Sequence, residues 1–360
     1  MEAVITPEGF QMRATHVFQC LIAVSLTSTG AGALLASSQE AAVPASQFEM
    51  KNWKITLPVD ENGDGKPDEV GVAEMKRFHQ PDFFYLNDDG HMVFAAPNKA
   101  ATTVNSSNTR SELRQMLRGT NTRIGTRDAG NNFAVRARNG SDKFGAVGGK
   151  LEATLKVDHV ALNAGDPTAK AAYSVVVGQI HAVKYDNTRS GFGYGNEPIK
   201  IYYKKFPDHE YGSVFWNYER NLAEDDPDRK DLSVPVFGGN WDGTQDPGEA
   251  GIALGEEFSY TINVHENTMY LTFHNDRLGS IVESRSLVRG ADAKDNPYAY
   301  GGDSLYFKAG VYNQCSTKSG GGDWYAGCAG TGDWATDKTN GDYAQATFSR
   351  LVLSEATPPE

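Results

Sequence analysis

Short runs in which apolar and polar residues alternate recur from about residue 50 to the end of the chain, and they constrain the fold more than any other feature. Two clear examples are residues 151–157 (LEATLKV) and 258–264 (FSYTINV). A period of two places the apolar side chains on one face of a strand, and helical periodicity is scarce. Because Gly, Asn and Asp separate the runs, we predict an all-β sandwich or barrel.

The same pattern predicts further strands and a hairpin, in which 258–264 turns at Glu266 and Asn267 into 269–273. The other expected strands are 172–183, 199–205, 213–218, 305–314 and 346–353. Two long polar stretches, 219–257 and 316–342, interrupt the pattern. Long structureless loops in a compact domain are commonly functional, so these are candidate lids over a cleft, with plain surface loops as the alternative.

The N-terminal segment has the features of a secretory signal. Met12 opens a short basic region, residues 17–36 form an apolar stretch, and 43–45 (VPA) offers small residues for cleavage. Ser, Thr and Gly dilute the apolar stretch too much for a stable membrane-spanning helix. We therefore expect residues 1–45 to be a signal peptide and processing segment, residues 46–360 to form one mature domain, and the protein to be secreted, either extracellular or periplasmic.

The cysteines agree with export. Cys20 lies in the signal segment, which leaves Cys315 and Cys328 in the mature chain. An even pair that closes a short Gly-rich loop in an exported protein indicates a disulfide and not a metal site.

The net charge of the chain limits the kinds of molecule that it can bind. The chain carries 34 Lys and Arg against 46 Asp and Glu, a net charge of −12, which argues against nucleic acid. An anionic sugar stays open, because a cleft responds to its local charge and not to the sum.

Residues 60–68 (DENGDGKPD) resemble the first positions of a calcium loop, with oxygen ligands at alternate residues. The position that should supply a bidentate Glu is Gly71, and Pro67 interrupts the pattern. We therefore expect an ordinary polar turn, with calcium binding as the alternative.

Three segments carry candidate chemistry. In 110–114 (RSELR), Arg110, Glu112 and Arg114 share one strand face, which makes a rigid array of donors around a carboxylate. A ladder of surface ion pairs is the alternative interpretation of this segment. In 179–181 (QIH), Gln179 and His181 share a face while the intervening Ile packs on the other.

The third segment is 306–314 (YFKAGVYNQ), which has the sharpest alternation in the chain. Tyr306, Lys308, Tyr312 and Gln314 should face one way, and the apolar residues between them should face the core. Two phenols, an ammonium and an amide on one face suit the binding of a hydroxylated, anionic chain.

Together these side chains match one reaction, the elimination across C4 and C5 of a uronate. Arg and Gln donors can neutralise the sugar carboxylate and stabilise the enolate-like charge that develops when C5 loses its proton. A base must reach that proton and an acid must reach the departing O4, and His and Tyr can serve in these roles.

At these residues the sequence resembles polysaccharide lyase family 7, whose alginate lyases carry an Arg-(Ser/Thr)-Glu-Leu-Arg strand, a Gln-(Ile/Val)-His strand and a Tyr-Phe-Lys-Ala-Gly-x-Tyr-x-Gln strand. The opening 53–58 (WKITLP) is also similar to the start of that domain, so the resemblance spans about residues 50 to 354. It implies a jelly-roll β-sandwich with an open concave substrate cleft, formed by a catalytic domain within residues 46–360.

The resemblance also implies roles for single residues. Arg110 and Gln179 would neutralise the carboxylate, and His181 and Tyr312 would be the acid and base. The residues implied to orient or bind the sugar are Glu112, Arg114, Tyr306, Lys308 and Gln314. Ile180 between Gln179 and His181 accompanies activity on guluronate-containing blocks in the family.

The expected partner is therefore alginate or a related anionic polysaccharide, with no cofactor, no metal for the chemistry, no nucleic acid and no membrane, and we expect a monomer.

Two alternatives stay open: a non-catalytic polysaccharide-binding β-sandwich module, which would need no base beside an acid, and a lyase for another polyuronate such as glucuronan. A glycoside hydrolase would need two carboxylates in the cleft, and the densest acidic cluster, 224–228 (EDDPD), lies in a Pro-containing loop.

Overall fold

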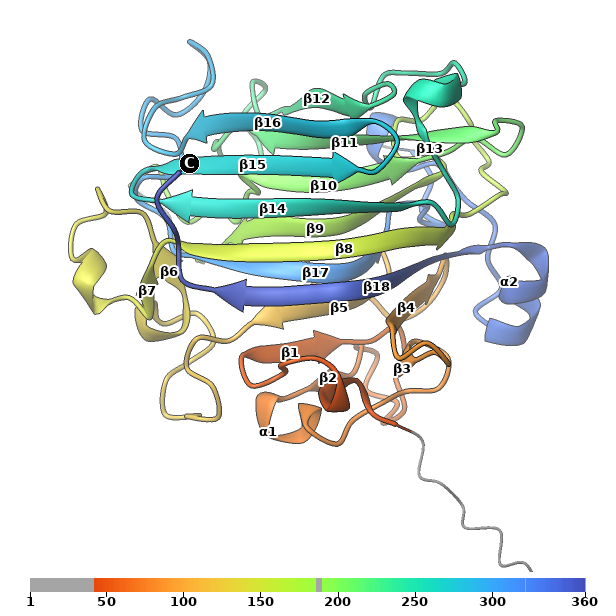
Figure 1. Cartoon of the computed structure of the whole chain (residues 1–360), viewed down its shortest axis with the longest axis horizontal. Helices are drawn as coiled ribbons and strands as arrows, with labels where there is room; N and C mark the ends of the chain where they lie inside the picture. The colour runs from red at the N-terminus through yellow and green to blue at the C-terminus, as the bar shows by residue number, and fades with distance from the viewer. Residues whose placement is uncertain (1–41, 186–189, 321, 360) are drawn as a thin grey trace, which may run out of the picture. The chain divides into compact units, whose positions relative to one another are not determined.

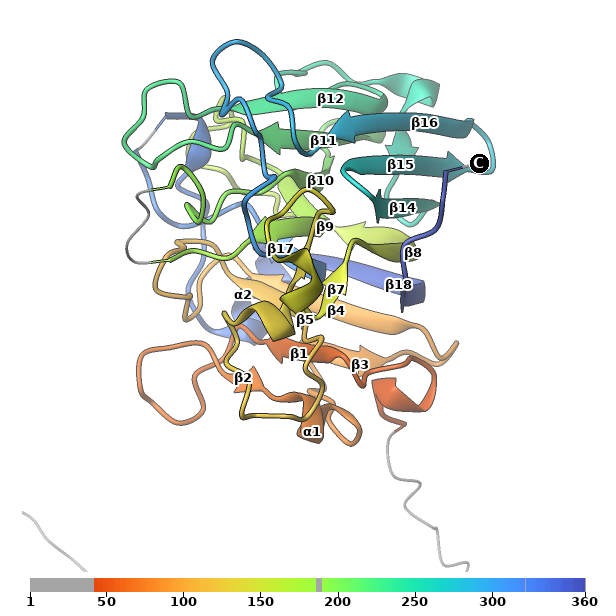
Figure 2. The same cartoon turned by 90° about the vertical axis from the view of Figure 1, so that its left-hand side faces the viewer.

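Two β-sheets packed face to face form the fold of the computed structural model, which describes residues 42–185, 190–320 and 322–359 (Figure 1). The predicted signal peptide falls almost wholly on residues 1–41, outside the described part. Figure 2 shows the two layers from the side, with β8, β14, β15, β16 and β18 in one and β9 to β12 in the other. Within the described part no helix is long and apolar enough to span a bilayer.

The first sheet has eleven described strands, with the main order β12-β11-β10-β9-β17-β5-β1-β2. Its strands are β1 (Trp53–Thr56), β2 (Glu69–Val70), β5 (Arg110–Gln115), β6 (Phe133–Ala134), β7 (Ala146–Val147), β9 (Ser174–Ala182), β10 (Ile199–Lys204), β11 (Tyr211–Glu219), β12 (Asp231–Phe237), β13 (Ile252–Ala253) and β17 (Leu305–Asn313). The three segments that carry the candidate chemistry form β5, β9 and β17, which are neighbours in the order β9-β17-β5.

The second sheet has seven described strands in the order β16-β15-β14-β8-β18-β4-β3. They are β3 (Phe84–Leu86), β4 (Met92–Pro97), β8 (Gly149–His159), β14 (Glu257–His265), β15 (Thr268–Asn275), β16 (Gly279–Ser286) and β18 (Tyr343–Ser354). The described helices are α1 (Val72–Met75), α2 (Trp334–Asn340) and short 3-10 turns at Pro44–Ser46, Ala129–Asn131, Ser141–Lys143, Gly248–Ala250 and Gly322–Trp324.

The core lies between the sheets and explains the alternation in the sequence. Ile180 of β9 and Phe307 of β17 belong to one buried cluster with Leu155 of β8 and Ile262 of β14. Burial of these apolar side chains is the main favourable term in folding. The predicted all-β jelly-roll sandwich is therefore confirmed, and so are the hairpin between β14 and β15 and every other strand predicted from alternation.

Three second-sheet strands were not predicted from the sequence: β3, which has only three residues, β4 and β16. Every residue of β4 is buried, so its sequence (MVFAAP) lacks the alternation of a half-exposed strand. In the edge strand β16 no residue is fully buried, and Val282 is 72 % exposed. Its apolar residues therefore do not mark a buried face.

The prediction of two long structureless stretches was wrong. Residues 219–257 contain β12 and β13, and β12 is an edge strand whose Pro235 masked its strand character. Residues 316–342 contain α2, which Asp333 caps by accepting a hydrogen bond from the Thr336 N–H at 2.9 Å. Gly341 ends this helix with a φ of +76°.

A local irregularity in β9 aims the candidate catalytic side chains. The pairing between β9 and β10 shifts by one residue around Val177, which leaves that residue as an extra one in β9. Val177 therefore faces the core, and Gln179 and His181 face the opposite side. Gly178 is required here, because a Cβ at this position would lie 2.3 Å from Oη of Tyr260 in the second sheet.

The predicted disulfide between Cys315 and Cys328 is present. It closes a loop, which we call the rim loop (residues 316–327), that leaves the end of β17. Trp324 and Tyr325 of the rim loop line the cleft described below. Lys170 holds this loop in place through ion pairs to Asp323 at 3.0 Å and to Asp242 at 2.9 Å.

Candidate active site

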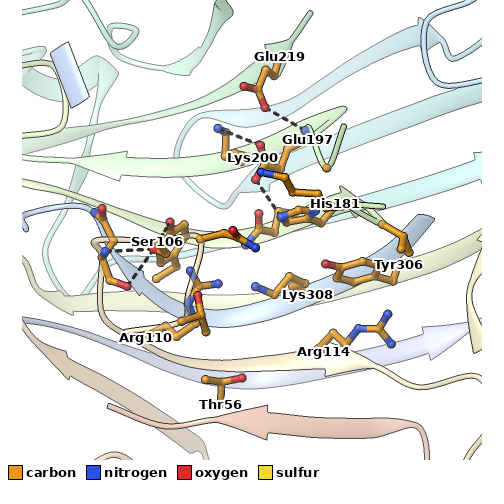
Figure 3. Close-up of a pocket in the computed structure, with 18 of the residues that line it drawn as sticks. Thr56, Ser106, Arg110, Arg114, His181, Glu197, Lys200, Glu219, Tyr306 and Lys308 are labelled. Carbon is orange, nitrogen blue, oxygen red and sulfur yellow. Dashed lines mark hydrogen bonds and ion pairs between the residues drawn. The ribbon is translucent and has the colours of Figure 1, made fainter. Parts of the chain in front are cut away.

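A cleft of about 660 Å³ lies on the outer face of the first sheet, and the candidate residues converge on it (Figure 3). Eight of the nine residues singled out from the sequence line it: Arg110, Arg114, Gln179, His181, Tyr306, Lys308, Tyr312 and Gln314. Strand pairing sets them in rows, with Arg114 opposite Lys308 and Lys308 opposite Gln179, and with Tyr306 opposite His181. The shared face predicted for each strand is confirmed.

Glu112 is the ninth residue and lies beneath the cleft surface, with 2 % of the residue exposed. Its carboxylate accepts hydrogen bonds from Arg110 Nη1 at 3.0 Å, from Gln179 Nε2 at 2.5 Å and from Lys308 Nζ. Burial alone would raise the pKa of Glu112, but the charges of Lys308 and Arg110 outweigh it and hold that pKa below its usual value. Glu112 therefore orients three donors of the cleft from below.

The same arrangement acts on Lys308. Burial lowers its pKa to about 8, and the neighbouring Arg110 acts in the same direction while Glu112 opposes both. Arg110 retains an Nε–H group that is buried and has no partner among the described residues. Nη1 of Arg110 thus binds Glu112, while the residue as a whole lines the cleft.

Arg114 has a different environment from the one expected of a substrate ligand. Its guanidinium donates to the carbonyl oxygens of Gln115 and Thr126 at 2.7 and 3.0 Å and to Oδ1 of Asn132 at 2.7 Å. It also lies 4.0 Å above the ring of Tyr306. Because these donors are occupied by the protein, Arg114 anchors the segment around residues 115–132 and fixes Tyr306.

His181 is held by contacts on both ring nitrogens. Nδ1 lies 2.6 Å from the carbonyl oxygen of Ala182, and Nε2 lies 3.2 Å from a carboxylate oxygen of Glu197. The ring stacks on Tyr306 with 5.3 Å between centroids and 9° between planes. Burial lowers the pKa of His181, with Glu197 opposing and Lys308 reinforcing that effect. A base of lowered pKa is present in its neutral form at mildly acidic pH.

Tyr312 is placed by three contacts. Its Oη lies 3.0 Å from Oγ of Ser106, and the Arg110 guanidinium lies 3.9 Å above its ring. The ring packs against an apolar cluster on the cleft side of the sheet that includes Val176 and Tyr202. Tyr312 is therefore a phenol fixed at its ring, with its oxygen directed at a polar partner.

A group of charged residues beside His181 was not predicted from the sequence, namely Glu197, Lys200, Glu219, Arg229 and Asp231. The strand 199–205 was predicted, and the alternation of Lys200, Tyr202 and Lys204 with apolar residues could have marked its polar face. Glu197 and Arg229 lie in loops, where no periodicity signals their direction. Ser106 also lies in a loop and was missed for the same reason.

The polar loop at residues 60–68 forms a turn that satisfies its own carboxylates. Asp60 accepts hydrogen bonds from the backbone N–H groups of Asp64 and Gly65 at 3.0 and 2.8 Å. Among the residues that the structure describes, no group of three or more His, Cys, Asp or Glu side chains is arranged to hold a metal ion.

Comparisons with known proteins agree with this site. A family model described as alginate lyase matches residues 48–355. An alginate lyase of Klebsiella pneumoniae is 36 % identical over 327 residues, which cover 88 % of this chain and 94 % of that protein.

Solved structures give the same result. The crystal structure of an alginate lyase from Klebsiella pneumoniae has a TM-score of 0.70 and 33 % identity, over 88 % of this chain and 99 % of that one. The exolytic family 7 alginate lyase of Zobellia galactanivorans has a TM-score of 0.71 and 35 % identity, with the same coverage. The expected resemblance is thereby confirmed, and this chain belongs to polysaccharide lyase family 7, the alginate lyases.

Proposed function

We propose that this alginate lyase cleaves the 1,4-glycosidic bond by β-elimination, with Arg110, Gln179, His181 and Tyr312 as its catalytic residues. A base takes the C5 proton, the electron pair of that C–H bond forms the C4–C5 double bond, and the C4–O4 bond breaks as an acid protonates O4. The products are an unsaturated uronate end and a free hydroxyl group, so no water is consumed.

The observation that carries the proposal is the convergence of a neutral base, a phenol and a guanidinium donor on one cleft. Arg110 and Gln179 line the cleft, and Glu112 aligns both side chains to receive the substrate carboxylate. Donors held in place before the reaction stabilise charge that develops at C5 without a cost of reorganisation.

The two uronates of alginate are C5 epimers, so the C5 proton lies on the side of O4 in one and on the opposite side in the other. One residue cannot easily be the base in both geometries. We assign Tyr312 as base and acid for mannuronate, and His181 as base with Tyr312 as acid for guluronate. The buried position of Ile180 in the core suits an indirect influence on substrate choice through Gln179 and His181, and we propose activity on guluronate-containing blocks.

Among the remaining cleft residues, we propose that Lys308, Gln314 and Tyr306 contact the sugar chain. Glu112 and Arg114 act on their neighbours instead, because their polar atoms already bind protein groups. We also propose that residues 1–45 direct export and are removed, and that residues 46–360 are the catalytic domain. The disulfide supports export, since such bonds persist in oxidising compartments.

The reaction is tested by ultraviolet absorbance of the unsaturated uronate on alginate, polymannuronate, polyguluronate and glucuronan. We expect absorbance to rise on alginate and polyguluronate. In the His181→Asn variant, we expect kcat on polyguluronate to fall about a hundredfold, because the base is lost, with a smaller loss on polymannuronate. Cleavage of alginate without new absorbance would contradict β-elimination, and exclusive activity on polymannuronate would contradict the preference.

A further inference from the structure

A buried ionic network adjoins His181, and none of the roles above uses it. Glu197 lies between His181 and Lys200, with its oxygens 3.2 Å from His181 Nε2 and 3.4 Å from Lys200 Nζ. Glu219 accepts a hydrogen bond from the backbone N–H of Glu197 at 3.1 Å and pairs with Arg229 at 2.8 Å. Figure 3 shows Glu197, Lys200 and Glu219 beside His181. The network thus joins His181 to groups from three further elements, β10, β11 and the loop before β12.

Carboxyl groups outnumber cations in this network. Lys200 also pairs with Asp231 at 3.3 Å, so two cations, Lys200 and Arg229, face three carboxyl groups. Burial and the adjacent Glu197 raise the pKa of Glu219 well above its usual range. Burial would raise the pKa of Glu197 too, but Lys200 and His181 outweigh it and keep that carboxyl ionised.

The contacts of His181 define which nitrogen can accept a proton. A carbonyl oxygen only accepts hydrogen bonds, so the close contact with Ala182 places a hydrogen on Nδ1. Nε2 is then the basic nitrogen, and a carboxylate oxygen of Glu197 lies 3.2 Å from it. The charged and titratable groups that face the ring from other strands are Arg110 of β5 and Tyr306 and Lys308 of β17, and both cations disfavour a second positive charge.

We propose that Glu197 is a positioning residue that acts through His181, because its carboxylate stabilises the imidazolium that forms when Nε2 takes the C5 proton of guluronate. This inference rests on the proposed function of His181 as a base. Glu197 supplies the negative charge that offsets Arg110 and Lys308 at this moment. An opposite charge within about 4 to 6 Å typically shifts a pKa by 1 to 3 units.

The test is Glu197→Gln, which keeps the shape of the side chain and removes its charge. Because the imidazolium loses its partner, the pKa of His181 falls. The neutral base then persists to lower pH, so the acidic limb of kcat/KM on polyguluronate should move down by about one pH unit or more. The weaker base should lower kcat on this substrate about tenfold, with KM unchanged. On polymannuronate, for which Tyr312 serves as base, both the limb and kcat should stay as in the wild type.

Two further variants keep the result decisive. Glu152→Gln removes a carboxylate that pairs with Lys150 and Arg350 on the second sheet, and it should leave both profiles unchanged. If Glu197→Gln does not fold, Glu197→Asp keeps the charge at a shorter reach and should retain the wild-type limb with a reduced kcat. An unchanged limb in Glu197→Gln, or equal losses on both substrates with a lower melting temperature, would overturn the inference. If the wild type forms no unsaturated uronate, the proposed function itself fails.

Discussion

Replacement of Tyr312 by Phe is expected to lower kcat at least about a hundredfold on every alginate substrate, the usual scale for loss of a general acid–base group. The substitution removes only the phenol oxygen, which lies 3.0 Å from Ser106 Oγ. The ring keeps its contacts with the Arg110 guanidinium and with the apolar cluster around Val176. Folding and substrate binding should therefore survive, and the loss should appear in kcat and not in KM.

Matched Tyr→Phe variants make this result specific. Tyr270→Phe lies on β15 of the second sheet and should have wild-type activity. Tyr306→Phe removes a phenol whose ring is fixed between His181 and Arg114, and burial raises the pKa of this Tyr306, which makes it a poorer proton donor. We expect a smaller loss in Tyr306→Phe than in Tyr312→Phe. Near-normal turnover of folded Tyr312→Phe would show that another group is the acid, and Tyr306 would be the first to test.

Glu112→Ala is expected to destabilise the protein by about 3 to 5 kcal/mol, because removal of one partner leaves uncompensated charges in a buried site. Lys308 and Arg110 both lose their counter-ion, and Gln179 loses its acceptor. Urea denaturation measures the loss in unfolding free energy. Glu152→Ala, in a partly exposed ion pair, should cost less than about 1 kcal/mol.

The pH dependence of stability gives an independent check on Glu112. Its pKa in the folded state is held below the usual value, so its stabilising effect is present above that usual value and is lost as the pH falls through the folded-state pKa. The stability difference between wild type and Glu112→Ala should therefore shrink in acid. A difference that is small at neutral pH would mean that the three donors do not depend on Glu112.

Alternation in the sequence could predict the strands and the face on which each candidate side chain lies, because one sheet face is buried and the other is not. It could not predict β4, which is buried throughout, or β12, which carries Pro235. The same limit applies inside the site. The face of Arg114 followed from periodicity, but its partners Thr126 and Asn132 come from a loop that only the fold brings close.

Glu197 shows why the rest of the site could not be predicted from the sequence. It lies two residues before β10, in a segment with no repeating pattern, and its neighbours come from β9, β11 and the loop before β12. The role of such a residue depends on distances between elements far apart in the chain. Its charge state depends on the neighbours as well, so neither could be read from the residues around position 197.

The rim loop has a consequence for affinity. Trp324 and Tyr325 present aromatic surfaces to the cleft from a loop that the Cys315–Cys328 bond closes and that Lys170 anchors. In the chain-entropy account, a disulfide that closes a loop of about 15 residues stabilises the folded loop by about 3 kcal/mol, because it limits the conformations of the unfolded chain. A sugar that docks against the rim loop does not have to order the loop first. The contacts between sugar and loop therefore contribute to affinity without that cost. Enzyme made in a reducing cytosol should therefore keep its proton-transfer groups in place and yet hold alginate more weakly than the oxidised form.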